Sequence, residues 1–151
     1  MPAIFDKLGI RFLYPENWTL DEQEAMAGEN AVTVYSPEGA FWSVMLHPKG
    51  VDPHGLTLAA LEAMKAEFTD FEAEPARETV EGIELAGFDM NFYCLDLTNT
   101  ALVRGCRLSD STCIILYQAE DRDFASIEPV FRAITISLMR SAGEAENGAD
   151  P

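Results

Sequence analysis

The chain has 151 residues and a mass of 16.7 kDa, with 48% hydrophobic residues and a formal net charge of −16 at pH 7. A chain of this size and hydrophobic content buries a core without a disulfide or a metal, and it has no apolar run near the roughly 18 residues of a spanning helix, so wholesale disorder and a membrane span are excluded. The acidic surface repels phosphate backbones and anionic lipids, which excludes nucleic acids and membranes as expected partners.

The two ends of the chain and its cysteines bear on where it is located. Residues 1–7 lack a basic region followed by an apolar one, so no signal peptide is expected. The cysteines are Cys94, Cys106 and Cys113. Their odd number and the lack of C-x-x-C spacing favour a reducing, cytoplasmic compartment. Residues 141–151 are small, polar and acidic, which predicts a disordered tail behind a single domain over residues 1–140.

The first half of the chain predicts four strands and then one helix. The expected strands cover residues 9–15, 18–24, 31–36 and 40–47. Pro37-Glu38-Gly39 is a turn signal that joins the last two strands as a hairpin. After a loop rich in Pro and Gly over residues 47–55, apolar residues recur at steps of three and four, which predicts an amphipathic helix over residues 57–69. The members of that stripe are Leu58, Leu61, Met64 and Phe68.

The second half predicts four more strands and a final helix. These strands cover residues 71–80, 88–94, 100–108 and 112–119. A helical period then runs from Phe124 to Leu138, and an N-cap at Ser126 would place Pro129 in the first turn, where proline is tolerated. The order of strands, helix, strands, helix predicts an α+β fold with an antiparallel sheet.

Two short patterns resemble those of PsbP-like proteins. The first is Phe12-Leu13-Tyr14-Pro15-Glu16-Asn17-Trp18, and the second runs from Phe124 through Pro129-Val130-Phe131 to Leu138. The resemblance implies an α/β/α sandwich with a central antiparallel sheet and two main helices. That fold is shared by photosystem PsbP, by the import factor that releases nucleotide from the Ran GTPase and by bacterial chaperones for secretion effectors. No functional residue is carried over, because a fold does not transfer activity.

Motifs for catalysis are missing from the sequence. It contains no G-x-G-x-x-G, Walker A, G-x-S-x-G or H-E-x-x-H pattern. Gly82 and Gly87 have the glycine spacing of a phosphate-binding loop, but Phe88-Asp89 stands where Lys-Ser/Thr would be needed. We therefore expect no cofactor, and an enzyme is the less favoured class.

One loop holds both histidines of the chain. His47 and His54 lie at its ends with Asp52 between them, and two imidazoles with a carboxylate could form a three-ligand metal site. Histidines beside Pro and Gly in a loop are more often solvated or bonded to the backbone, so no metal is the favoured interpretation.

The expected hairpin of the last two strands pairs two cysteines. If Ser109-Asp110 forms the turn, Cys106 lies opposite Cys113. The two thiols could form a cross-strand disulfide or a redox pair, but two small hydrophobic residues in a reduced sheet are favoured.

Candidate contact residues for a partner are acidic or aromatic. Asp70, Glu72 and Glu74 are two apart, so on a strand they share a face; they form either a solvated surface or a patch for a basic or amphipathic partner. Tyr14 and Trp18 either cover an edge of the core or grip a ligand. Trp42 either lies in the core or lines an apolar groove of a chaperone-like protein.

These observations predict a non-catalytic binding, adaptor or chaperone-like domain that presents an acidic surface to a polypeptide. The alternative is a small-molecule-binding domain or small enzyme with a pocket between helix and sheet. A monomer and a homodimer are both compatible with the sequence, because acidic edge strands can protect themselves or be covered.

Overall fold

The computed structural model describes residues 1–148, with side chains as far as Glu144. Its strands are β1 (Pro2–Lys7), β2 (Ile10–Pro15), β3 (Thr19–Asp21), β4 (Ala31–Tyr35), β5 (Phe41–Pro48), β6 (Thr69–Val80), β7 (Ile83–Cys94), β8 (Leu97–Arg107) and β9 (Ser111–Glu120). Its helices are α1 (Gln23–Met26), α2 (Pro53–Glu67) and α3 (Asp121–Gly148). The expected strands and the two main helices are all present, whereas β1 and the short α1 were not predicted.

Seven strands form one antiparallel sheet in the order β3-β4-β5-β9-β8-β7-β6. β1 and β2 form a separate antiparallel hairpin. The predicted α+β fold with an antiparallel sheet is confirmed. So is the predicted hairpin register, because Cys106 pairs with Cys113.

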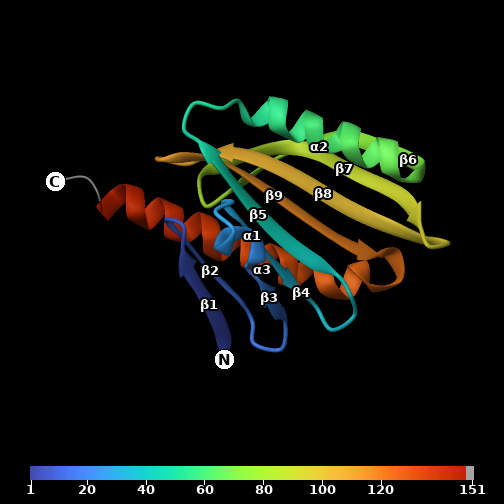
Figure 1. The fold of residues 1–151 in the computed structure, drawn as a ribbon, viewed down its shortest axis with the longest axis horizontal. Coiled ribbons are helices and arrows are strands. Elements are labelled where there is room, and N and C mark those ends of the chain that lie inside the picture. The colour runs from blue at the N-terminus through green and yellow to red at the C-terminus, as the bar shows by residue number, and fades with distance from the viewer. Residues whose placement is uncertain (149–151) are drawn as a thin grey trace.

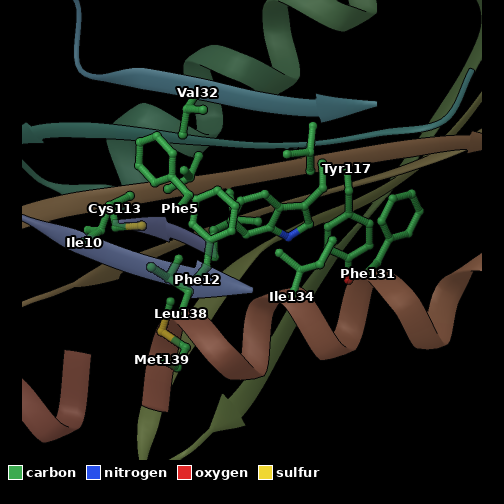
Figure 2. Packing of buried hydrophobic residues seen from close by; sticks show 14 of the residues in the cluster. Phe5, Ile10, Phe12, Val32, Cys113, Tyr117, Phe131, Ile134, Leu138 and Met139 are labelled. Carbon is green, nitrogen blue, oxygen red and sulfur yellow. The ribbon is translucent and has the colours of Figure 1, made fainter. Parts of the chain in front are cut away.

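The two main helices cover opposite faces of the sheet (Figure 1). Helix α2 packs on β7, β8 and β9 through a cluster that includes Met64, Met90 and Val103. Helix α3 and the β1–β2 hairpin cover the other face, where Phe12 and Phe131 lie in the main core (Figure 2). This arrangement confirms the α/β/α sandwich. No helix within residues 1–148 is both long enough and apolar enough to span a membrane.

Helix α2 begins four residues before the predicted start. The Asp52 carboxylate accepts a hydrogen bond from the backbone N–H of His54 at 3.1 Å, and Pro53 occupies the first turn, where its missing N–H costs nothing. Leu58, expected on the buried stripe, is 40% exposed, whereas Leu61 and Met64 pack toward the sheet.

Helix α3 extends beyond the predicted helix at both ends. The expected N-cap at Ser126 is wrong: the helix begins at Asp121, where Asp121 and Asp123 interact favourably with the positive end of the helix dipole, and Pro129 lies inside it. The helix also continues to Gly148 and so extends into the predicted tail. The last three residues of the predicted tail lie outside the described residues.

Two tight turns connect the long strands β6, β7 and β8. Glu81-Gly82 and Leu95-Asp96 each have positive φ at both positions, which is the conformation of a two-residue type I′ hairpin turn. Gly82 is suited to this conformation, whereas Leu95, with φ of 53°, is strained in it.

Candidate functional site

A pocket of about 190 Å³ lies between helix α3 and the sheet, and we call it the helix–sheet pocket. Polar side chains of β6, β8, β9 and α3 line it, among them Glu78, Arg104, Tyr117, Glu128, Arg132 and Thr135. The pocket is therefore built from side chains that are far apart in the sequence and meet only in the folded sheet.

Arg104 is the buried charge of this pocket, with 5% of its surface exposed. Its Nε donates to Glu78 at 2.7 Å and its Nη2 to Asp89 at 2.6 Å, while Nη1 donates to the backbone carbonyls of Phe88 and Val103. Burial acts to lower the pKa of the Arg104 guanidinium, but the hydrogen bonds to Glu78 and Asp89 outweigh it and raise that pKa above its ordinary value. Arg104 stays charged and links β8 to β6 and β7.

Tyr117 supplies a hydroxyl to the same pocket. The residue is 8% exposed, and its ring stacks on Phe131 with the ring centres 4.6 Å apart. The ring points its hydroxyl toward helix α3 (Figure 2), and this hydroxyl makes no hydrogen bond with the described residues. Burial raises the pKa of Tyr117 to about 12, with the charges of Glu78 and Arg104 among the further contributions. A neutral hydroxyl therefore faces the pocket at physiological pH.

A second cavity, of about 340 Å³, adjoins the helix–sheet pocket, and its carboxylates define what we call the acidic groove. They are Glu72, Glu74, Asp89 and Glu128. Glu128 also lines the helix–sheet pocket, and Asp89 binds Arg104, so the two cavities lie side by side. Arg132 pairs with Glu128 at 3.2 Å, whereas Glu72 and Glu74 make no ion pair with the residues that the structure describes.

The predicted acidic contact residues have different positions. Glu72 and Glu74 lie on one face of β6, as their spacing predicted, and both are exposed in the acidic groove. Asp70 is exposed too, but it lies at an irregularity in the β6–β7 pairing with φ of 51°, outside the groove lining. The structure therefore groups two of the three with carboxylates that the sequence analysis had not connected to them.

Tyr14 lines a separate apolar cavity of about 620 Å³ between the β1–β2 hairpin and α3. Leu13, Pro15, Pro129 and Val130 also line it, so the two patterns on which the PsbP resemblance rests meet there. Tyr14 is half-buried and stays a predicted contact residue.

The two tryptophans that were candidate contact residues belong to the core, which corrects that part of the prediction. Trp42 is fully buried, and its indole Nε1 donates to the Thr135 hydroxyl at 3.0 Å. Trp18 is 8% exposed and meets Phe131 edge to face. Neither side chain offers a contact surface, because each is used to join the sheet layer to α3.

The histidine loop does not assemble the metal site that was considered. Among the described residues, no group of three or more His, Cys, Asp and Glu side chains is arranged to hold a metal ion. The Asp52 carboxylate instead caps α2 by accepting from the N–H of His54, and Arg107 lies 3.8 Å from it. His47, Asp52 and His54 therefore do not form a three-ligand site.

The cysteine pair is present as two buried free thiols. Cys106 and Cys113 lie opposite each other in the β8–β9 ladder, and the hydrogen bond between their thiols, together with burial, raises the pKa of Cys113 well above its ordinary value. In this state they are two small side chains of the core, which was the favoured interpretation.

Arg104 and Tyr117 were not among the predicted site residues, although the sequence carries one signal for Arg104. Leu102, Arg104 and Cys106 alternate along a predicted strand, so the arginine shares the face of two apolar residues. A charge on a buried face needs a carboxylate partner, but the sequence does not indicate which of its 26 acidic residues supplies it. Tyr117 carries no such signal, because a tyrosine in an apolar strand is usual in a core.

Comparisons with known proteins identify the fold. No protein-family model and no curated protein sequence matches the chain. Among solved structures, the cyanobacterial PsbP (CyanoP) of Synechocystis is similar, with 13% identity, a TM-score of 0.58 and coverage of 90% of each chain. The Ran-binding protein Mog1p of Saccharomyces cerevisiae is 12% identical with a TM-score of 0.56, over 95% of this chain and 93% of that one. A Pseudomonas aeruginosa protein of unknown function is 12% identical with a TM-score of 0.55, over 91% of this chain and 95% of that one.

At such identities the likeness concerns the fold alone. It extends over at least nine-tenths of the chain. The chain has the fold of PsbP and Mog1p.

Proposed function

We propose that this chain is a non-catalytic binding domain whose acidic groove receives a basic segment of a polypeptide partner. The observation that carries the proposal is the position of the acidic groove beside the helix–sheet pocket, into which the Tyr117 hydroxyl projects without a hydrogen bond to the described residues. A hydroxyl that reaches solvent in a pocket can both donate and accept a hydrogen bond, so a ligand that enters the pocket can bond to it in place of water.

The charge of the groove selects the chemistry of that ligand. Asp89 and Glu128 are already paired with arginines, but Glu72 and Glu74 add two negative charges that make no ion pair with the described residues. The whole chain has a net charge of −16, which attracts cations over a longer range. Lysine and arginine side chains fit these conditions, whereas nucleic acids and anionic lipids do not.

A protein partner is further supported by one structural neighbour. Mog1p is described as a Ran-binding protein, so a protein of this fold binds another protein. An adaptor or chaperone-like role, a cytoplasmic location and a monomeric or homodimeric state remain predictions from the sequence.

The proposal can be tested with hexalysine peptide as a defined basic probe. We expect hexalysine to bind the full chain at low salt, and Glu72→Gln/Glu74→Gln to weaken its affinity by at least about threefold, the loss of two partly exposed charge pairs. Glu62→Gln/Glu67→Gln removes the same charge from exposed positions on α2, outside the groove lining, and is the matched control. Calorimetric titration measures all three affinities. Equal losses in the two double variants would overturn the proposal, because overall charge alone would then account for the binding.

A small-molecule-binding domain is the second candidate, and the helix–sheet pocket favours it. Polar groups from four elements converge there, as in small-ligand sites. Native mass spectrometry of the chain purified gently from its own cells distinguishes the two functions. A small-molecule adduct that Tyr117→Phe abolishes would support this candidate, and a bound polypeptide that Glu72→Gln/Glu74→Gln releases would support the first.

A further inference from the structure

The tip of the β7–β8 hairpin combines backbone strain with exposed apolar surface. Leu95 and Asp96 both have positive φ, at 53° and 63°, in a two-residue turn that favours Asn-Gly. Leu95 is also 91% exposed. Tyr93 and Leu97 flank it with 44% and 36% exposure, on opposite faces of the hairpin because Leu97 pairs with Cys94, and we call these three residues the apolar tip. A leucine in this position costs stability twice, through its conformation and through its contact with water.

The apolar tip is next to the acidic groove. Asn91 and Thr100, a register pair of β7 and β8, line the groove. Tyr93 follows Asn91 by two residues and therefore points to the same face of the sheet. Leu95 follows Asn91 by four residues, a span of about 13 Å in a strand.

We propose that the apolar tip is the second contact of the polypeptide partner, and that it packs against an apolar side chain about four extended residues away from the partner's basic residues. The inference rests on the proposed function and makes the partner segment amphipathic. The acidic groove attracts its cationic part, and the three apolar side chains of the tip, which flank the exposed turn residue Asp96 at the end of the same two strands, receive its apolar part.

The test uses two peptides that differ only in apolar character. One has hexalysine at its centre, three glycines on each side and a leucine at each end; the other has serine in place of leucine. Leucine at both ends makes the result independent of the direction in which the peptide binds. Burying one leucine side chain on the tip should make the leucine peptide bind the full chain about tenfold more tightly than the serine peptide.

The decisive variant is Leu95→Asn/Asp96→Gly. It replaces the strained turn with the preferred pair, so the thermal midpoint should rise, while the tenfold preference for the leucine peptide should disappear. A stability gain together with a binding loss cannot come from unfolding. Leu58→Asn, at an exposed position on α2, is the matched control and should keep the preference.

Each result separates the tip from the groove. Equal affinities of the two peptides for the unmodified chain, or a preference that survives in Leu95→Asn/Asp96→Gly, would overturn the inference while hexalysine binding still supports the groove. A dimer that the unmodified chain forms and this variant does not would also overturn it, because a second copy would then occupy the tip. If hexalysine binding ignores Glu72→Gln/Glu74→Gln, the proposed function fails, and a leucine preference lost in the tip variant still supports the tip.

Discussion

Arg104 shows at the level of one residue how this fold accommodates a charge in its interior. The guanidinium is 5% exposed, but its two carboxylate partners are only partly buried, with 32% exposure for Glu78 and 47% for Asp89. If the arginine is lost, water therefore solvates much of the charge of these carboxylates. The loss in free energy of unfolding is then at the lower end of the range known for breaking a buried ion pair.

We predict that Arg104→Met lowers the free energy of unfolding by roughly 3 kcal/mol. Arg107→Met removes an exposed arginine of the same strand, whose nearest carboxylate is 3.8 Å away, and should change it by less than about 0.5 kcal/mol. Urea unfolding of both variants measures the difference. Equal effects would show that the buried network contributes no more than a surface pair.

Tyr117 makes stability dependent on pH in the alkaline range. Its pKa is about 12 in the folded chain and about 10 in an unfolded one, so the folded state holds its proton more tightly. The contribution of this tyrosine to the free energy of unfolding is fully present below pH 10 and is lost as the pH rises toward 12.

Between pH 9 and about pH 11, the free energy of unfolding of the unmodified chain should fall by about 1.4 kcal/mol more than that of Tyr117→Phe. The phenylalanine variant keeps the ring that stacks on Phe131 and has no proton to lose, so it subtracts the titration of all other groups. Urea unfolding at the two pH values measures the effect, and parallel losses in both proteins would contradict it.

Among the secondary-structure elements, helix α3 contains a proline in its interior, where proline is least expected. Pro129 lies eight residues after the first residue of the helix, so it removes a backbone hydrogen bond to the carbonyl of Ala125. Pro75, by contrast, lies on β6, an edge strand of the sheet, where proline is tolerated.

Pro129→Ala should restore that hydrogen bond and raise the free energy of unfolding by roughly 1–3 kcal/mol. The gain is smaller by the amount that the proline ring contributes through its contacts at the apolar cavity. Pro75→Ala is the control and should change it by less than about 0.5 kcal/mol. Thermal unfolding followed by circular dichroism measures both. A destabilised Pro129→Ala would mean that the ring stabilises α3 by more than the missing hydrogen bond costs.

The elements that the sequence predicted well are those with local signals. The turn residues Ser109-Asp110 set the pairing of Cys106 with Cys113, and alternation placed Phe92 on the buried face of β7. Helix boundaries were less accurate because they depend on competing caps, so Asp121 rather than Ser126 begins α3. The acidic groove was predicted only through Glu72 and Glu74, since the sequence does not show which acids come together from β7 and α3.

The net negative charge of the whole molecule destabilises its compact folded state. Twenty-six acidic residues face ten basic ones, and the nine ion pairs found among the described residues involve eight of those ten. The remaining carboxylates repel one another through solvent, over distances that salt can screen.

Stability should therefore rise as sodium chloride increases from about 0.01 M to about 0.1 M, which shortens the screening length from about 30 Å to about 10 Å. The urea midpoint measures the change, and an unchanged slope shows that the unfolded state exposes the same surface. A midpoint that falls would mean that attractive pairs outweigh the repulsion.

The order of strands in the sheet also has a consequence for how the chain folds. Every neighbouring pair in the seven-stranded sheet is consecutive in sequence except β5 and β9, whose pairing joins Pro48 to Ser111. The sheet is thus two local meanders, β3–β5 and β6–β9, that meet along one seam. Each meander needs only short loops to close, whereas the seam must bring distant segments together. Closure of the seam is then the slow event, and Trp42, whose strand forms one side of it, is placed to report that event by its fluorescence.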